Sequence, residues 1–360
     1  MKLQKTVLIG ISGGVDSSVA ALLLQKQGYR VVGAFMKNFS DTKNKYTGEC
    51  QWIEEKQMAE RICALIGIEL IMIDYEKEYK KTVIEPMIKS YSRGFTPNPD
   101  VDCNNQIKFP ALWEKAQEIR ADYIATGHYA QIKKVKSEYR LLQGKDKTKD
   151  QSYFLYHLSQ KDLEHTLFPL GNLTKTEVRQ IAKKNHFPNH DKKGSKGICF
   201  VGKVNMQDFL SKHIKTKQGK VLDNAGNTLG SHSGASSYTI GQRVGPHIGI
   251  NIEKPIGTEE KRWFVSSKRG NTLIIAPKEH ASLKIKSIKI KKIHLLVSKI
   301  PKNNIKVRIR HLGQLISGKL VKNKSLFSFI FSKPQLGIAP GQDAVLYYKN
   351  QVLGGGEISL

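Results

Sequence analysis

Cysteine is scarce in this sequence, which has four cysteines in 360 residues and no two of them in a CxxC pair. Cysteines this few and this scattered exclude a disulfide framework and argue against a zinc or iron–sulfur centre, so we expect no resident metal site. Long apolar runs are also missing, since no segment approaches about 18 uninterrupted apolar residues, and the apolar start has no cleavage-like site. We therefore expect a cytoplasmic protein with functional thiols and no membrane partner.

Acidic residues are few: 31 Asp and Glu stand against 59 Lys and Arg, which gives a formal net charge of +28. A surface with this excess attracts polyanions. A lysine-rich composition without any such partner would give the same total, so charge alone does not decide. A chain of 360 residues is also long for a single core, and about two or three domains are expected.

The dinucleotide fingerprint GxGxxG is absent after the first apolar run, which argues against a Rossmann oxidoreductase. The run instead leads into SGGVDSS at 12–18. Glycines between a strand and a helix leave backbone N–H groups uncovered, and the helix start adds its positive dipole end, so this turn predicts a phosphate or pyrophosphate site. Asp16 stands where the common phosphate loop has lysine, and a carboxylate beside phosphates implies Mg²⁺. The alternative is a plain connection in which Asp16 caps the helix.

The first half of the chain alternates β-type runs with helical stretches. Strands are expected at 5–10, 30–35, 68–74 and 122–127, and helices at 50–66 and 104–120. This order predicts an α/β fold with a doubly wound parallel sheet. Because ligands bind at the carboxyl ends of such strands, residues 12–17 and the pair Gly127 and His128 should meet in one crevice.

After about residue 205 the sequence changes to β-rich runs separated by turn residues. We expect a nucleotide-binding domain at 1–205, a small, mostly β connecting domain at 206–275 and a C-terminal β-barrel at 276–360. The stretch LKIKSIKIKK at 283–292 alternates Lys and Ile for part of its length, as a strand with one solvated face would. Its lysines fit an RNA contact and fit equally well the protection of an edge strand.

Two cysteines are candidate reactive thiols. Cys103 follows a proline-stiffened loop and leads into an expected helix, where a thiolate is favoured, although a core thiol is equally consistent with this position. Cys199 lies in a glycine-containing stretch with lysines around it, which would lower its pKa. Cys63 lies on the apolar side of a helical stretch and is expected to be buried and inert.

Eight motifs resemble, in order, those of the bacterial tRNA-specific 2-thiouridylases, the MnmA family. They are SGGVDSS, MKN at 36–38, GEC at 48–50, TPNPDVxCNxxIKF, TGHYA, KDQSYFLY, GICFVG and YTIGQR. The resemblance covers nearly the whole chain. The wider N-type ATP pyrophosphatases, the PP-loop superfamily, share only the first motif, which alone would also allow amide-forming or lysidine-forming ligases. The two cysteine motifs discriminate between these activities.

The resemblance implies ATP-dependent conversion of the wobble uridine of the tRNAs for Lys, Glu and Gln to 2-thiouridine. ATP with Mg²⁺ would adenylate the C2 oxygen of the base, with release of pyrophosphate and then AMP. Sulfur would arrive as a persulfide on Cys199, delivered by a cysteine desulfurase or a sulfur-relay protein. Cys103 would resolve it, ending in a Cys103–Cys199 disulfide, whether the persulfide itself or freed hydrosulfide attacks C2. Asp100 would be the acid/base group, the alternative being turn formation after Pro99.

The resemblance also assigns contacts, residue by residue. ATP contacts fall on Gly10, Ser12, Gly13, Gly14, Val15, Asp16, Ser17, Met36 and Gly127. Contacts with the target base fall on Asn98, Pro99 and Asp100, and further tRNA contacts on His128, Lys149, Asp150, Gln151, Arg310, His311 and Gln342. Both halves of the chain are therefore expected to bind one tRNA.

The sequence departs from the family pattern at a few positions. Gly194 and Lys196 replace the usual residues before GICF, which predicts a more mobile loop and a more acidic thiol at Cys199. Asp102 beside Cys103 would raise the pKa of that thiol and slow resolution. The residues around Arg310, VRIRHLGQ at 307–314, also differ from the Arg-Tyr-Arg-Gln string that is frequent in the family. A non-catalytic tRNA-binding protein of the same fold, or another PP-loop ligase, remains the alternative.

Overall fold

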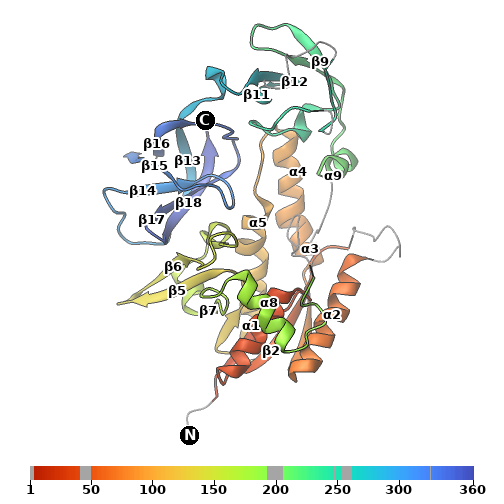
Figure 1. Cartoon of the computed structure of the whole chain (residues 1–360), viewed down its shortest axis with the longest axis vertical. Coiled ribbons are helices and arrows are strands. Elements are labelled where there is room, and N and C mark those ends of the chain that lie inside the picture. The colour runs from red at the N-terminus through yellow and green to blue at the C-terminus, as the bar shows by residue number, and fades with distance from the viewer. Residues whose placement is uncertain (1–3, 41–49, 193–205, 246–247, 253–261, 325) are drawn as a thin grey trace.

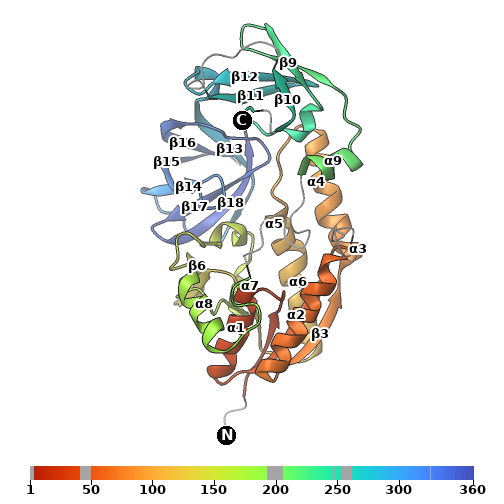
Figure 2. The ribbon, with the colours of Figure 1, turned by 45° about the vertical axis from the view of Figure 1, so that its right-hand side comes forward.

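The computed structural model describes residues 4–40, 50–192, 206–245, 248–252, 262–324 and 326–360. In Figure 1 the N-terminal α/β domain lies at the bottom, the barrel lies beside and above it, and a smaller sheet lies at the top. Helix α4 (Glu85–Ser92) runs from the α/β domain toward the smaller sheet. The chain is therefore elongated, with the barrel placed against the side of the helical region (Figure 2).

The N-terminal domain is built on a parallel sheet in the order β3-β2-β1-β4-β7. The strands are β1 (Thr6–Gly10), β2 (Arg30–Lys37), β3 (Glu69–Asp74), β4 (Tyr123–Ala125) and β7 (Thr166–Leu167). All pairings within it are parallel. Strand β1 is central because its run TVLIG is buried on both faces.

Helices cover both faces of this sheet, as the doubly wound prediction requires. Val7 and Ile9 face α1 (Val15–Lys26), α2 (Gln51–Ile66) and α8 (Lys175–Lys184). Leu8 lies between them in the strand, so its side chain points to the other face and packs in the opposite layer, which includes Leu112. The predicted α/β fold with a parallel sheet is confirmed.

The opposite layer consists of two broken helices. The first runs through α3 (Glu76–Tyr79), a π-helical segment η1 (Lys80–Ile84) and α4. The second runs through α5 (Pro99–Asp102), a π-helical segment η2 (Cys103–Lys108) and α6 (Phe109–Glu118). The second helix therefore begins at Pro99, five residues before the expected start at 104, because Pro is favoured in the first turn of a helix.

The C-terminal barrel is closed. Its strands are β13 (Ile285–Leu295), β14 (Ile305–Arg308), β15 (Ile316–Asn323), β16 (Leu326–Gln335), β17 (Asp343–Tyr348) and β18 (Gln351–Ser359). Antiparallel pairing runs β13-β16-β15-β14-β17-β18, and β18 returns to β13. Ile288 and Ile290 of β13 are buried while Lys289 and Lys291 are exposed. The edge-strand interpretation of this stretch was wrong, because β13 is paired on both sides.

A hairpin from the N-terminal domain extends the barrel sheet. Strands β5 (Ala130–Val135) and β6 (Glu138–Gln143) pair with each other, and β6 continues the sheet beside β18 through Leu142 and Gln351. The polar connection that follows contains the short helices η3 (Ser152–Leu155) and α7 (Gln160–Glu164). The barrel is thus joined to the N-terminal domain by main-chain pairing as well as by side chains.

The smaller sheet has the order β10-β9-β8-β12-β11. Its strands are β8 (Gly219–Leu222), β9 (Thr228–His232), β10 (Ile250–Ile252), β11 (Trp263–Arg269) and β12 (Thr272–Pro277), and α9 (Met206–His213), η4 (Ala235–Ser237) and η6 (Ala281–Leu283) flank them. Three hydrogen bonds tie the loop between α4 and α5 to the two C-terminal units. Thr96 N donates to Pro340 O at 2.9 Å, Thr96 Oγ1 to Thr239 Oγ1 at 3.1 Å, and Lys268 Nζ to Gly94 O at 3.2 Å. The position of α5 therefore depends on all three units.

Candidate functional site

The glycine turn after β1 has the form of an anion site. Gly13 has φ +69°, a left-handed conformation that favours glycine. Helix α1 starts at Val15 with Gly14 as N-cap and without a side-chain cap, so Asp16 is not the cap and that alternative was wrong. Inside the turn, Ser17 Oγ donates to Gly14 O at 3.0 Å and accepts from Ser12 N at 3.2 Å. The first amides of α1 are therefore not covered by a capping side chain.

Asp16 is held by two partners that the sequence analysis did not identify. Lys175 Nζ lies 2.6 Å and 2.7 Å from the two carboxylate oxygens, and Tyr129 OH donates to Oδ1 at 2.7 Å. Lys175 is the first residue of α8, whose N-cap Thr174 and Glu177 form a capping box. A cation at a helix N-terminus opposes the helix dipole, so an anion nearby stabilises it. The capping-box pattern TxxE in the sequence could have located this helix start, although not its contact with Asp16.

The ends of β1 and β4 meet, as expected. A Cβ built on Gly127 would lie 2.8 Å from Ser17 N and 2.9 Å from Asp16 C, both backbone atoms, so only glycine allows this approach. Met36, near the end of β2, is buried in the layer below α6. The predicted ATP contacts therefore lie at one edge of the sheet.

His128 lies beside this edge and is buried. Its Nδ1 is 2.7 Å from Thr126 Oγ1, and its ring stacks on Phe109 with 6.0 Å between centroids. Burial holds the pKa of His128 well below its usual range, so the imidazole is neutral near pH 7. A contact of His128 with RNA would therefore not be a charge contact with phosphate.

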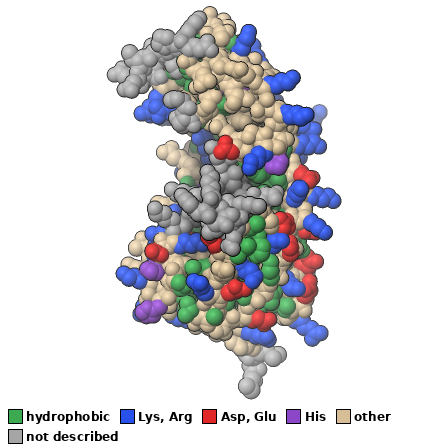
Figure 3. All heavy atoms as spheres, turned by 90° about the vertical axis from the view of Figure 1, so that its right-hand side faces the viewer, with side chains coloured by type: hydrophobic (Ala, Val, Ile, Leu, Met, Phe, Trp, Pro, Cys, Tyr) green, Lys and Arg blue, Asp and Glu red, His purple; other side chains and the backbone are tan. Residues whose placement is uncertain are grey.

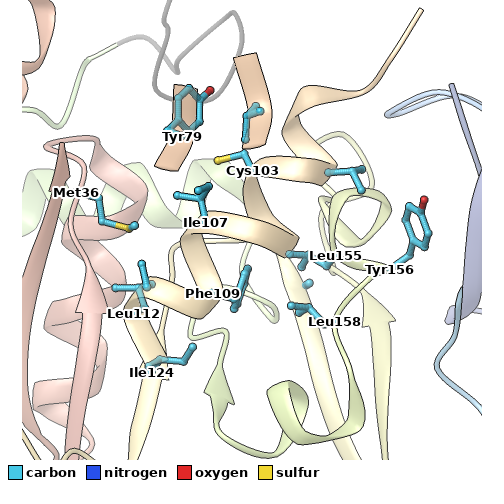
Figure 4. Packing of buried hydrophobic residues seen from close by; sticks show 14 of the residues in the cluster. Met36, Tyr79, Cys103, Ile107, Phe109, Leu112, Ile124, Leu155, Tyr156 and Leu158 are labelled. Carbon is cyan, nitrogen blue, oxygen red and sulfur yellow. The ribbon is translucent and has the colours of Figure 1, made fainter. Parts of the chain in front are cut away.

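The helix that starts at Pro99 carries the predicted base contacts and the first thiol. Asn98 is its N-cap, and Pro99 and Asp100 are half-buried in its first turn. Cys103 lies one turn further on and is 0% exposed. Figure 4 shows its sulfur directed to the side on which Met36 and Tyr79 lie, with Tyr156 on the other side. Cys199, Gly194 and Lys196 lie outside the described residues.

Asp102 directly precedes Cys103 and lines a cavity on the barrel side of the helix, whereas Cys103 is part of the core. Burial raises the pKa of Asp102 to about 6, and Gln106 Nε2 donates to its Oδ1 at 3.5 Å. Cys63 is buried in the layer of α1 and α2 on the other face of the sheet, and burial raises the pKa of its thiol to about 11. These surroundings are those of an unreactive thiol at Cys63.

The three residues expected to contact tRNA at 149–151 differ in their exposure to solvent. Lys149 is exposed, whereas Asp150 is 0% exposed. Asp150 accepts from Arg308 Nη1 at 2.7 Å, from Gln143 Nε2 at 2.9 Å, and from the backbone amides of Gly144 and Ser152. Its carboxylate therefore joins the N-terminal domain to β14 and does not face solvent. Gln151 Oε1 accepts from Tyr129 N at 3.0 Å. Gln151 is therefore linked to Asp16 through Tyr129, whose hydroxyl donates to the Asp16 carboxylate.

Two expected tRNA contacts on the barrel have polar atoms without a hydrogen-bond partner among the described residues: His311 Nδ1 and Gln342 Oε1. Burial lowers the pKa of His311 to about 4, and its ring lies 4.3 Å from that of Phe154. Arg310 is exposed and its guanidinium donates to Gly337 O. A bound molecule could supply the hydrogen bonds that His311 Nδ1 and Gln342 Oε1 do not make within the described residues.

The distribution of positive charge does not by itself locate a surface that binds tRNA. On the face shown in Figure 3, Lys and Arg side chains are scattered among Asp and Glu and form no single patch. In the described part of the chain no group of three or more His, Cys, Asp and Glu could hold a metal ion. Among the described helices none is long and apolar enough to cross a membrane.

A parallel sheet with a glycine turn at its strand ends, followed by a small sheet and a closed barrel, defines a multidomain α/β protein of the HUP class. Residues 5–203 match the family described as tRNA methyl transferase HUP domain, 207–277 the tRNA methyl transferase PRC-barrel domain, and 285–358 the Aminomethyltransferase beta-barrel domain. The chain is 41% identical over 366 residues to tRNA-specific 2-thiouridylase MnmA 2 of Aliarcobacter butzleri (strain RM4018), covering 100% of this chain and 99% of that one. It is 42% identical over 363 residues to tRNA-specific 2-thiouridylase MnmA of Blochmanniella floridana, covering 99% and 96%.

The chain belongs to the MnmA family of tRNA-specific 2-thiouridylases. The resemblance seen in the motifs is therefore confirmed. Among solved structures, NMN synthetase from Francisella tularensis is 22% identical with a TM-score of 0.35, covering 54% of this chain and 67% of that chain. That likeness is too weak to carry an argument.

Proposed function

We propose that this chain is a tRNA-uridine 2-sulfurtransferase that acts on the wobble uridine of the tRNAs for Lys, Glu and Gln, in the cytoplasm. The observation that carries the proposal is the match, over the full length of the chain, to relatives named tRNA-specific 2-thiouridylases. The anion-type turn supports it. The helix that starts at Pro99 supports it as well, because it carries Asn98 and Asp100 at its start and places Cys103 in the core layer that includes Met36 of β2. We assign the catalytic domain to 1–205, the connecting domain to 206–275 and the tRNA-contacting barrel to 276–360.

The proposed first step is adenylation of the base. The C2 oxygen of uracil attacks the α-phosphate of ATP, the bond to the β-phosphate oxygen breaks, and pyrophosphate leaves toward the turn at 12–17. Uracil C2 needs this activation because the ring nitrogens feed electrons into its carbonyl, whose oxygen is a poor leaving group. Mg²⁺ bound with the triphosphate would neutralise part of its charge. The uncapped amides of α1 and the Lys175 ammonium provide donors and positive charge for the departing group.

The proposed second step transfers sulfur. A cysteine desulfurase or relay protein places a persulfide on Cys199, and either its terminal sulfur or freed hydrosulfide attacks C2. AMP carries away the former C2 oxygen. In both routes Cys103 attacks the sulfur of Cys199, which leaves a disulfide between them for a thiol reductant to reopen. Asp100 is assigned to proton transfer at the base.

The experiment that tests the assignment uses unmodified tRNA for Lys together with the same tRNA carrying cytidine at the wobble position. Each is incubated with the chain, Mg-ATP, cysteine and a cysteine desulfurase, then digested and analysed by mass spectrometry. We expect 2-thiouridine at the wobble position of the first tRNA and none in the second. Thiouridine at another position, or equal thiolation of both tRNAs, would refute the site assignment.

The sulfur route has a separate readout. With sulfur-35 cysteine and the desulfurase, label should appear on the wild-type chain and be absent from the Cys199→Ser variant, because Cys199 is the proposed acceptor. Label that persists on the variant would refute the acceptor assignment. Activity that survives alkylation of Cys199 would favour another PP-loop ligase, and tRNA binding with steep salt dependence but no pyrophosphate release would favour a non-catalytic binder.

Replacing Lys175 with methionine should slow tRNA-dependent pyrophosphate release by roughly a hundredfold, as loss of a charge-stabilising donor does in other active sites. The ammonium lies 2.6 Å from Asp16 at the start of α8 and close to the anion-type turn. Lys183→Met is the matched control, because Lys183 is exposed in the last turn of the same helix. Pyrophosphate release is measured by a coupled assay at saturating tRNA. Equal rates for the two variants would remove Lys175 from the site.

A further inference from the structure

The glycine turn after β1 is held from its inner side by a side chain from a distant part of the chain. Asn189 Nδ2 donates to Gly13 O at 3.0 Å, across 176 residues, and to Ser18 Oγ at 3.0 Å. Asn189 is 1% exposed and Ser18 is 0% exposed. Ser18 Oγ in turn donates to Gly14 O at 2.9 Å. One buried amide therefore holds the carbonyl oxygens of both glycines, the first directly and the second through Ser18.

Fixing these two carbonyl oxygens also fixes the amides that share their peptide groups. A peptide group is planar and trans, so its N–H points away from its C=O. The carbonyl of Gly13 belongs to the same peptide group as the N–H of Gly14, and the carbonyl of Gly14 to that of Val15. On the outer side, Gly14 N donates to Ser12 Oγ at 3.4 Å, and Ser12 is an exposed residue among the expected ATP contacts. The carbonyls thus face the protein interior, and the amides face the side where an anion would bind.

Asn189 is anchored by the segment that follows α8. Lys192 N donates to Asn189 O at 3.0 Å, and Phe187 is 1% exposed and packs in the layer of α1 and α2. At its first residue the same helix places Lys175 against Asp16. The α8 region therefore contacts the glycine turn from both of its ends.

The other end of the Asn189 amide makes no hydrogen bond. Its Oδ1 is buried and has no partner among the described residues. A buried acceptor without a partner lowers stability, so the amide is not explained by what it adds to the packing of the core. Both hydrogen bonds that it makes go to the segment that forms the turn and the start of α1. This indicates that the side chain serves the geometry of the turn.

We propose that Asn189 is a positioning residue for the glycine turn. It holds the carbonyls of Gly13 and Gly14 inward so that the turn amides bind the β- and γ-phosphates of ATP. The inference rests on the proposed function, in which these two phosphates leave as pyrophosphate. They occupy the turn both before and after the bond to the α-phosphate breaks. Loss of Asn189 therefore weakens the binding of ATP and of pyrophosphate alike and changes the rate of the bond-breaking step little.

The test compares wild type with Asn189→Ala. In equilibrium dialysis without tRNA, the variant should bind Mg-ATP roughly tenfold more weakly, which corresponds to about one lost hydrogen bond. In tRNA-dependent AMP formation, the KM for Mg-ATP and the inhibition constant of inorganic pyrophosphate should rise by the same factor. The kcat and the KM for tRNA should stay within about twofold of wild type. A variant that had only lost part of its folded fraction would instead show a lower kcat and an unchanged KM.

Asn185→Ala is the matched control. Asn185 is half-buried at the end of α8, and its Nδ2 donates to Ile181 O at 2.7 Å. Its side chain makes no hydrogen bond to the turn within the described part of the chain, so its substitution should leave both ATP constants at wild-type values. If Asn189→Ala does not fold, Ser18→Ala replaces it with the same expected changes, because it removes the hydroxyl that links Asn189 to Gly14.

The outcomes separate this inference from the proposed function. Asn189→Ala with wild-type affinity for Mg-ATP, with the same loss as Asn185→Ala, or with a lower kcat at an unchanged KM overturns the positioning role and leaves the proposed function intact. Wild type that binds Mg-ATP but forms no 2-thiouridine overturns the proposed function alone, and dialysis still decides the role of Asn189. Wild type that binds Mg-ATP neither with nor without tRNA overturns both.

Discussion

Replacing Cys103 with serine should lower the rate of thiouridine formation by at least about a thousandfold while leaving tRNA affinity within about twofold. In the proposed route Cys103 releases sulfur by forming a disulfide with Cys199, and a serine hydroxyl cannot do this because an alcohol neither attacks a persulfide nor accepts one. The measurement is 2-thiouridine per tRNA by mass spectrometry, with filter binding for affinity. The variant should still release pyrophosphate, since adenylation does not use the thiol.

Cys63→Ser is the matched control for this experiment. Both cysteines are buried, at 2% exposed for Cys63 and 0% for Cys103, so both substitutions place a hydroxyl in a core. Each should cost stability of order 1–2 kcal/mol. Only Cys103→Ser should lose thiolation, because Cys63 lies on the other face of the sheet in the layer of α1 and α2. Equal loss of activity in the two variants would mean that core disruption, and not loss of a reacting thiol, explains the effect.

Arg308→Ala should reduce the free energy of unfolding by about 3–5 kcal/mol, the range for breaking a buried ion pair from one side. Arg308 and Asp150 are both buried and lie 2.7 Å apart, and the guanidinium also lies 5.1 Å from the ring centre of Tyr347. Without Arg308, Asp150 keeps only neutral donors around a buried charge. Urea unfolding measures the change, and Lys306→Ala, exposed on the same strand, should stay within about 0.5 kcal/mol of wild type.

The pH dependence of this loss has a definite sign. Burial alone would raise the pKa of Asp150, but hydrogen bonds from Arg308, Ser152 and Gln143 outweigh it and hold the pKa below its usual value. A depressed pKa in the folded state stabilises the protein above the unfolded pKa of about 3.9, and this contribution disappears as pH falls through the folded pKa. The stabilisation that the Asp150 carboxylate gives wild type should therefore be full near pH 7 and disappear below about pH 4. Without Arg308 burial raises the pKa of Asp150, so the difference between wild type and Arg308→Ala should shrink as the pH falls. A difference that grows on acidification would contradict the ion-pair explanation.

The sheet and its glycine turn could be predicted from sequence because their signals are local. The apolar run of β1 and the glycines that follow it are neighbours in the chain, and so are the turn residues and strands of the barrel. Asp16 and Lys175 are 159 residues apart, and no spacing rule connects them. The same holds for Asp150 and Arg308, separated by 158 residues. The family resemblance assigned Asp150 to a tRNA contact, and the folded chain places its carboxylate inside, at 0% exposed.

Cys103 illustrates an alternative that its local sequence left open, since a core thiol was as consistent with its position as a reactive one. It precedes Ile107 by four residues, a spacing that places both on one face of a helix, and both are buried in the same layer. The prediction of a thiol near a helix start relied on the prolines and placed the start five residues too late. With Pro99 in the first turn, Cys103 lies in the second, where helix periodicity directs it into the core. A buried position does not remove the thiol from the proposed chemistry, but it requires that ligand binding open access to it.

The central claim is tested most directly by a single reaction of the purified chain. Unmodified tRNA for Lys, Mg-ATP, cysteine and a cysteine desulfurase are combined, and 2-thiouridine, AMP and pyrophosphate are quantified in the same sample. The account predicts one AMP and one pyrophosphate for each 2-thiouridine formed, with no thiouridine when ATP is omitted. Thiouridine formed without ATP, or a folded chain that binds the tRNA yet yields neither AMP nor thiouridine, would contradict it.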